Sequence, residues 1–169
     1  MRRIREDVGD DIALVRAMPT LTVDGYSQVA LYAEEGSLTA EQVGRVEGFF
    51  GNFGNCIWLD SEDKFPAYTL FAASMIAFLA NYLLEFKKHA VELGFSDGQS
   101  EMMLAGALRS AAHLIERGYT LEQIQEKVAT KGGMTAMGIA ASERGNAQSE
   151  VARTMLEDGI EHSKALAKS

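Results

Sequence analysis

The residues with the clearest capacity for binding chemistry lie in the segment Ala129–Thr135, which reads Ala-Thr-Lys-Gly-Gly-Met-Thr. The adjacent glycines, Gly132 and Gly133, let backbone N–H groups converge, and a helix that starts after them presents free N–H groups. Lys131 adds a positive charge and Thr135 a hydroxyl donor. The segment can therefore bind a carboxylate or a phosphate. By spacing alone, an ordinary turn after a helix is the commoner explanation, because glycine so often ends helices.

The other reactive side chains form no recognisable site. His89, His113 and His162 are far apart in the sequence, and the pair Glu85 and His89 is typical of a solvated helix face. Cys56 stands in a predicted strand, where a lone cysteine is a small buried hydrophobe. The sequence has no Gly-x-Gly-x-x-Gly fingerprint, P-loop or Gly-x-Ser-x-Gly elbow. We expect no metal site and no cofactor bound by these residues alone.

The first sixty residues predict a few short strands and one helix. Continuous apolar runs predict buried strands, and Thr39 can cap a helix whose polar face carries glutamates. We expect strands at Asp11–Ala17, Tyr26–Tyr32 and Cys56–Leu59, a loop over Met18–Asp24, and a helix from Thr39 to about Phe53. So few strands cannot bury a sheet by themselves. They need the helices, a partner chain or further sequence to cover them.

The rest of the chain predicts helices only, so the fold class is mostly α. Glycines and capping residues divide this part into successive helices. We expect helices at 65–94, 98–117, 120–130, Met134–Glu143 and Ala147–Lys168. The last helix is acidic at its start and ends in lysines, as the helix dipole favours.

The segment Phe65–Leu84 contains no charged residue and is long enough to span a bilayer. Against a membrane span stand Pro66, Ser74 and Asn81, which put polar atoms at several depths, and five alanines, which contribute little to lipid transfer. A helix that is apolar all round is otherwise buried on all sides. In a chain of this size such burial usually needs a second subunit. We expect a homodimer formed through the helix spanning residues 65–94.

Composition narrows the classes further. The 169 residues carry 16 Lys+Arg and 24 Asp+Glu, a net charge of −8, which counts against non-specific nucleic-acid binding. The single cysteine suits a reducing compartment. We see no apolar stretch of the kind that follows the basic end of a signal peptide, and we expect a cytoplasmic protein of one domain or slightly more.

Four segments, in this order, resemble pyrroline-5-carboxylate reductases. They are Val15-Arg-Ala-Met-Pro19, Cys56-Ile-Trp-Leu-Asp60, the long helix beginning Tyr68-Thr69-Leu-Phe, and Val128-Ala-Thr-Lys-Gly-Gly-Met-Thr135. The resemblance covers nearly the whole chain but only the last part of that family. It implies that residues 1–60 are strands and a helix from the end of a Rossmann domain. Residues 61–169 would be an all-helical dimerisation domain of the 6-phosphogluconate dehydrogenase C-terminal-like type.

The resemblance also implies a function. Members of the family reduce pyrroline-5-carboxylate to proline with NADPH or NADH, and an N-terminal Rossmann domain binds the nucleotide. The substrate carboxylate lies near the Gly-Gly-x-Thr loop, so Gly132, Gly133 and Thr135 would bind substrate here. The family's Ser-Gly-Ser-Gly-Pro-Ala stretch beside the substrate leaves one serine in this sequence, Ser74, as a further substrate-binding candidate.

Departures from the family pattern bear on activity. The Met-Pro-Asn-Thr-Pro stretch reads Met-Pro-Thr-Leu-Thr over residues 18–22. The serine–glycine stretch reads Ala-Ala-Ser-Met-Ile-Ala over residues 72–77, which predicts a continuous helix and fills space beside the substrate. Two hypotheses follow. The chain is either the helical half of a reductase that acts with a separate Rossmann partner, or a non-catalytic homodimeric assembly or carboxylate-binding module derived from that family.

Overall fold

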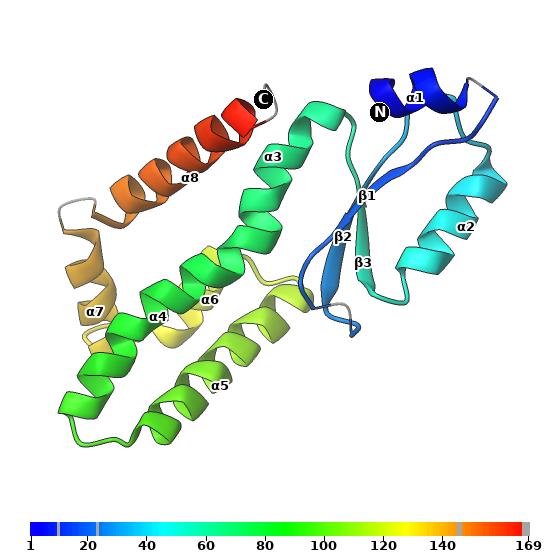
Figure 1. Ribbon diagram of the computed structural model, residues 1–169. Helices are drawn as coiled ribbons and strands as arrows, with labels where there is room; N and C mark the ends of the chain where they lie inside the picture. Colours follow the sequence, from blue (N-terminus) through cyan, green and yellow to red (C-terminus); the bar gives the residue numbers. More distant parts are fainter. Residues whose placement is uncertain (10, 23, 145–146, 167–169) are drawn as a thin grey trace. The chain divides into compact units, whose positions relative to one another are not determined.

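A computed structural model describes residues 1–9, 11–22, 24–144 and 147–166 (Figure 1). The described chain is mostly helical and carries one small sheet, as the composition of its segments predicts. Its contacts divide it into two compact units. The first comprises Met1–Ile76 and Asp158–Ser169, and the second comprises Ala77–Glu157. The separate division into domains at residues 1–60 and 61–169 stays a prediction.

The first unit is built on a three-stranded sheet in the order β1-β2-β3. Strand β1 (Arg16–Pro19) runs antiparallel to β2 (Ser27–Tyr32), and β3 (Gly54–Trp58) runs parallel to β2. The central strand supplies the core, because Val29, Ala30 and Leu31 are fully buried. Phe65 and Leu70 from the following helical segments complete the apolar core.

The expected strand at Asp11–Ala17 is wrong in position. Arg16 pairs with Tyr32, the last residue of β2, so residues before Arg16 have no strand opposite them. The observed strand instead includes Pro19, which was expected in a loop. Thr20 donates its backbone N–H to Gln28, so the ring nitrogen of the preceding Pro19 points to the outer edge, where no donor is needed. The first helix, α1 (Arg2–Val8), was not expected from the sequence.

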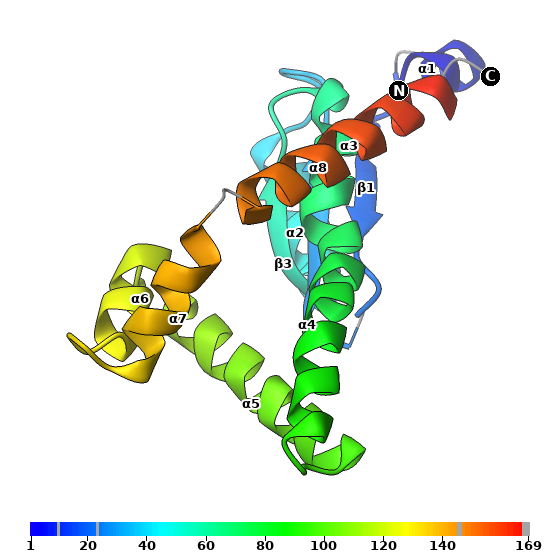
Figure 2. The same cartoon turned by 90° about the vertical axis from the view of Figure 1, so that its left-hand side faces the viewer.

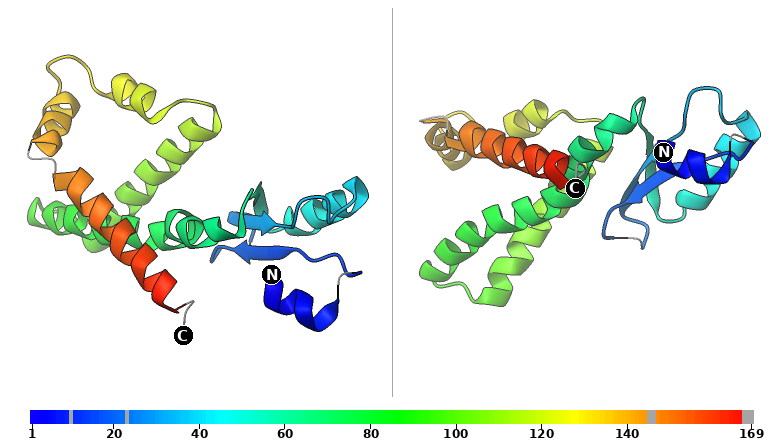
Figure 3. Two further views of the ribbon diagram at one scale, coloured as in Figure 1. Left: turned by 90° about the horizontal axis from the view of Figure 1, so that it is seen from above. Right: turned by 45° about the horizontal axis from the view of Figure 1, so that its top comes forward.

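Helix α2 (Ala40–Phe50) connects β2 to β3 (Figure 3). Thr39 caps it as expected, and the cap is reciprocal: Thr39 Oγ1 accepts from Gln42 N–H at 3.3 Å, and Gln42 Oε1 accepts from Thr39 N–H at 2.8 Å. The helix ends before the predicted Phe53, because the chain must turn into β3 at Gly54. Gly54 has φ +148°, and a Cβ there would collide with the backbone of Ser27.

The segment after β3 is helical in several forms. A short 3-10 turn, η1 (Glu62–Lys64), leads into α3 (Phe65–Tyr68), and a π-helical stretch, η2 (Thr69–Ser74), joins α3 to α4 (Met75–Glu92). Thr69 Oγ1 donates to Phe65 O at 2.8 Å, a bond that competes for the helical carbonyl. The end of α8 lies against η2 (Figure 2), and Gly159 contacts Leu70 there.

The second unit consists of helices that begin and end close to the predicted positions. Helix α5 (Asp97–Glu116) is capped by Ser96, and α6 (Leu121–Val128) is capped by Thr120. Helix α7 (Met134–Glu143) matches its predicted bounds, and α8 (Ala147–Leu166) begins where expected. Gly94 and Gly118 have the positive φ of helix-ending glycines. The predicted stop at residues 145–146 and the predicted end at Lys168 lie outside the described residues.

Helices α4 and α5 form a hairpin that turns at Gly94 and opens away from that turn (Figures 1 and 3). Lys87 links the two helices near the turn. Its Nζ lies 2.7 Å from Glu101 Oε1 and 3.2 Å from Asp97 Oδ2. Hydrogen bonds to Glu101 and then Asp97 raise the pKa of Lys87 and keep it cationic.

Candidate functional site

The loop between α6 and α7 and the first turn of α7 carry three of the four predicted site residues. Figure 2 shows it as a tip that projects from the helices of the second unit. Gly132 has φ +74°, a left-handed conformation that favours glycine, and it is exposed. The reversal at Gly132 brings Gly133 N–H back to Thr130 O at 2.9 Å. This turn places Gly133 at the N-cap of α7.

Gly133 cannot carry a side chain without moving the loop. A Cβ there would collide with the hydroxyl of Thr130 and lie 3.0 Å from its carbonyl oxygen. The N-cap position consequently has no side chain to accept from the first turn of α7. Met137 N–H bonds back to Gly133 O at 3.2 Å, as the first intrahelical bond of α7. The two glycines thus allow the tight turn of the loop and leave the N-terminus of α7 without a side-chain cap.

The N–H groups of residues 134–136 have no acceptor within the described part of the chain. Such free donors, with the positive end of the helix dipole, favour an anionic group. The exposed hydroxyl of Thr135 lies in the same turn, and no bond to it is found among the described residues. Gly132, Gly133 and Thr135 are therefore together and accessible, and Lys131 adjoins them on the exposed loop.

The fourth predicted residue, Ser74, belongs to the first unit. It is the last residue of the π-helical stretch and is half-buried. The helix continues from Ser74 into Met75 without a break, as the replacement of the family's glycines and proline predicts. The sequence did not predict the π-helical form, although such single-turn insertions often occur at functional positions in helices.

A buried polar pair at the end of β1 was also missed. Thr20 Oγ1 accepts from Gln28 N–H at 3.1 Å, and Ser27 Oγ accepts from Thr20 N–H at 3.1 Å. The two hydroxyls lie 3.2 Å apart. Thr20 stands where the resemblance expects an asparagine, so the polar atom at this position is already used inside the fold. An isolated threonine after Pro19 gives no sequence signal of that pairing.

Two further titratable groups lie near the sheet. Partial burial raises the pKa of the Cys56 thiol, and the carboxylate of Glu47 raises it further. Glu47 itself accepts a hydrogen bond from Trp58 Nε1 at 2.7 Å. Burial likewise raises the pKa of Tyr68. An elevated pKa keeps the thiol protonated, so Cys56 is a poor nucleophile at neutral pH.

The described residues do not fit a dinucleotide or a metal. No group of three His, Cys, Asp or Glu side chains that could hold a metal ion occurs among them. The segment between β2 and α2 carries Glu34 and Glu35, and the segment after β3 carries Asp60 and Glu62. A pyrophosphate needs a glycine-rich turn at a helix N-terminus. Neither segment has such a turn, and three of these carboxylates are already paired with Arg5, Arg16 and Lys64.

These features define a mostly helical chain with a small attached sheet and an exposed glycine turn at the start of α7. The sequence model of a family described as "Pyrroline-5-carboxylate reductase dimerisation" matches residues 62–166, well over half of the chain. The chain belongs to the pyrroline-5-carboxylate reductase dimerisation family.

Individual proteins agree with that assignment. A pyrroline-5-carboxylate reductase of Neurospora crassa is 30% identical over 161 residues, which cover 92% of this chain and 48% of the relative. The solved reductase of Coxiella burnetii has a TM-score of 0.88 at 25% identity, with 96% of this chain and 60% of that chain covered.

A pyrroline carboxylate reductase of Plasmodium falciparum, solved with NADP bound, shares the fold with a TM-score of 0.81. Its identity is 18%, and the match covers 98% of this chain and 66% of that chain. The chain spans about half the length of the curated relatives it matches.

Proposed function

We propose that this chain forms the helical, homodimeric half of a pyrroline-5-carboxylate reductase and works with a nucleotide-binding domain on a separate polypeptide. The observations that carry the proposal are the family match over 62–166 and the lack of a glycine-rich turn after β2 and after β3 in the described residues. NADPH or NADH, the cofactors that the family resemblance implies, would then be held by residues outside this sequence.

Within this proposal the α6–α7 loop binds the substrate carboxylate. The free N–H groups after Gly133 and the hydroxyl of Thr135 supply donors, and the exposed Lys131 supplies a positive charge. Gly132 and Gly133 keep the loop tight and uncovered. Ser74, in the first unit, is a further substrate-binding candidate on the ground of the family resemblance. These residues position an anion and do not themselves transfer a hydride.

Two observations favour a second candidate function. The helix is continuous through the Ala-Ala-Ser-Met-Ile-Ala stretch at 72–77. The hydroxyl of Thr20 is hydrogen-bonded to Ser27 and Gln28. Both features remove polar or open space that the resemblance would place beside a substrate. The alternative is a non-catalytic homodimer that binds a carboxylate at the same loop.

An assay of pyrroline-5-carboxylate reduction, monitored by the loss of NADPH absorbance, distinguishes the two candidate functions. The purified chain is assayed alone and then mixed with the separately produced nucleotide-binding domain of the Neurospora crassa reductase. We expect no turnover from the chain alone and turnover from the mixture. Turnover by the chain alone would contradict the division of labour. A mixture that forms a complex but stays inactive would favour the non-catalytic homodimer.

The loop is tested in the same assay with a matched pair of variants. Thr135→Ala removes the hydroxyl, and we expect it to raise the KM for pyrroline-5-carboxylate about tenfold, the cost of one hydrogen bond to a charged group. Thr135→Ser keeps the hydroxyl and should behave as the unmodified chain. Should the two variants have the same KM, the loop does not bind the substrate.

A further inference from the structure

Strand β3 is an edge strand of the small sheet in the first unit. Its backbone bonds to β2 begin with Ser27 N–H to Phe53 O at 2.9 Å and end with Leu59 N–H to Leu31 O at 2.8 Å. Because bonding groups alternate along a strand, the odd-numbered residues of this segment face β2 and the even-numbered ones point outward. The outward N–H and C=O groups have no backbone partner in the described part of the chain. They belong to Gly54, Cys56 and Trp58.

This edge of the sheet lacks the features that usually keep strands from pairing. Natural edge strands carry charged residues or prolines, which discourage a further strand from adding to the sheet. The strand at the opposite edge, β1, has Arg16 and Pro19. By contrast, the segment Gly51–Leu59 has no charged residue and no proline. Its Ile57 is 42% exposed, so an apolar side chain also lies open there. The edge of β3 is therefore suited to pairing with another strand.

The outward groups of β3 match those of a second copy of the same strand. In an antiparallel arrangement about a two-fold axis, Cys56 exchanges both backbone bonds with Cys56 of the second copy. Gly54 then lies opposite Trp58 of the second copy, and Trp58 lies opposite Gly54. Every outward residue thus has a partner in this register. A large ring opposite a glycine also fills the space that the glycine leaves, which stabilises glycines in edge strands.

No like charges meet in this arrangement. The first charged residue after β3 is Asp60, and its carboxylate lies 2.7 Å from the ammonium of Lys64. Antiparallel pairing brings this end of β3 near the start of β3 in the second copy, where Gly51–Asn55 carry no charge. We propose that β3 of one copy pairs antiparallel with β3 of a second copy, centred on Cys56, and joins the two small sheets into one.

This contact is independent of the helical homodimer in the proposed function. Strand β3 lies outside residues 62–166, the part that matches the dimerisation family. A chain with two different self-complementary surfaces forms assemblies larger than a dimer. Loss of one contact therefore leaves the other measurable, and the two can fail separately.

Cys56 is the single cysteine of the chain, so the unmodified protein tests the pairing. Opposed residues in a hydrogen-bonded antiparallel pair have Cα atoms about 5.5 Å apart, which a disulfide can span. Oxidation with diamide should join two chains in a band of twice the chain mass. The control is Leu21→Cys in a Cys56→Ser chain, which should give no such band although Leu21 is 83% exposed.

A second pair of positions tests the register. Asn55 and Ile57 are both exposed, and each lies opposite the other in the proposed pairing. In Cys56→Ser chains with different tags, Asn55→Cys and Ile57→Cys should form a mixed disulfide. Asn55→Cys chains alone should not, because their Cα atoms would be about 7–8 Å apart. Failure of both the Cys56 disulfide and the mixed disulfide would overturn the proposal.

Sedimentation with a charged edge separates this contact from the helical homodimer. Ile57→Lys puts like charges near each other across the two-fold axis, and the exposed position should not disturb folding. We expect this variant to form assemblies of about half the mass of the unmodified ones, and an equal mixture with Ile57→Glu chains to recover the larger mass. Leu21→Lys should have no effect.

The masses of the unmodified chain and of the Ile57→Lys variant decide between the outcomes. A dimer that is unchanged by Ile57→Lys would overturn the β3 contact and leave the helical homodimer standing. A dimer that becomes a monomer in this variant would support the β3 contact and contradict the homodimer through residues 65–94. A monomer at all concentrations would overturn both.

Discussion

The contact between α8 and the π-helical stretch gives a quantitative test of the packing of the first unit. At Gly159 an added Cβ would lie 2.6 Å from Leu70 Cδ2 and 3.3 Å from Leu70 Cδ1. Leu70 is only 7% exposed, so its side chain has little room to turn away. Gly159→Ala therefore inserts a methyl group into an occupied space.

The expected size of the effect follows from two opposed terms. Alanine in a helix interior is favoured over glycine by about 1 kcal/mol. Overpacking a filled core costs about 1–3 kcal/mol, and we take about 2 because the colliding atoms end a flexible side chain. Gly159→Ala should thus lower the free energy of unfolding by about 1 kcal/mol. Gly44→Ala in α2, where no atom lies within 4 Å of the added Cβ, should raise it by about 1 kcal/mol.

A double-mutant cycle isolates the collision. Leu70→Ala alone should destabilise by about 2–5 kcal/mol because it empties a buried site. In that background Gly159→Ala meets no side chain, so it should become stabilising by about 1 kcal/mol. Urea unfolding at one fixed protein concentration measures all four proteins, since dimerisation couples to stability. If Gly159→Ala stabilises the unmodified chain as much as Gly44→Ala does, α8 does not pack on Leu70 as described.

Three other predictions address single features. Thr39→Ala removes the cap of α2 and should cost about 1 kcal/mol in urea unfolding; no loss would show that the reciprocal cap contributes nothing. Gly132→Ala forces a side chain into φ +74° and should destabilise by about 1 kcal/mol, and an unchanged midpoint would argue against the described turn. Cys56 should react with Ellman's reagent at pH 8 more slowly than free cysteine, because burial and Glu47 raise the pKa of its thiol and leave less thiolate. Glu47→Gln should shift the pH profile of the reaction rate to lower pH. An unshifted profile would contradict this account.

Local signals were strong enough to predict most helices of the chain. Thr39, Ser96 and Thr120 each begin a helix, and each is paired with a glutamine three residues later that completes a capping box. Gly94 and Gly118 end helices with the positive φ that glycine tolerates. Such caps act within one turn of the chain, so they can be read without knowing the tertiary fold.

The misplaced strand at Asp11–Ala17 shows that local sequence patterns do not predict the bounds of a strand. Nothing in the run Asp11–Ala17 reveals that its pairing partner ends at Tyr32, opposite Arg16. Strand bounds depend on the register with a distant segment, and propensity says little about that. The π-helical stretch Thr69–Ser74 is likewise in contact with a distant segment, because its buried Leu70 lies against Gly159, nearly ninety positions further along the sequence.

The candidate loop was accessible to sequence reasoning for a similar reason. Two adjacent glycines between helices specify a tight turn locally, and the structure has that turn, with Gly133 as the N-cap of α7. The sequence could not reveal that the hydroxyl of Thr20 is hydrogen-bonded to Ser27 and Gln28, since these bonds require β1 and β2 to be in register.

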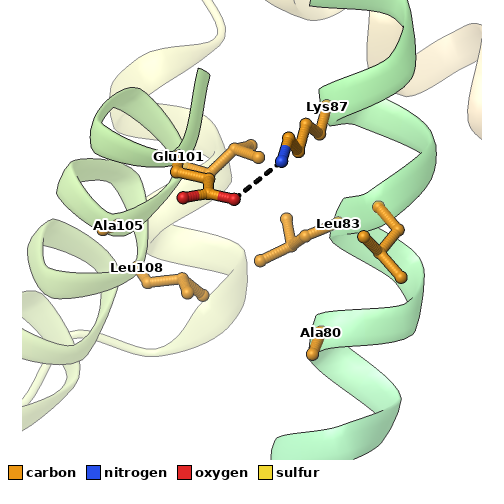
Figure 4. A pocket seen from close by; sticks show the side chains of 8 residues that line it. Ala80, Leu83, Lys87, Glu101, Ala105 and Leu108 are labelled. Carbon is orange, nitrogen blue, oxygen red and sulfur yellow. Dashed lines mark hydrogen bonds and ion pairs between the residues drawn. The ribbon is translucent and has the colours of Figure 1, made fainter. Parts of the chain in front are cut away.

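One helical stretch, Glu62–Glu92, is long and apolar enough to cross a membrane, with a mean hydropathy of 1.6 in its most apolar window. Only 11% of that window is buried in the single chain, so most of it must find other cover. Lys87 of α4, half-buried and paired with two carboxylates of α5, one of them Glu101 (Figure 4), argues for protein as that cover. In lipid these charges would have to be kept from the hydrocarbon, whereas a second copy can cover the apolar side chains and leave the ion pair in water at the edge of the interface.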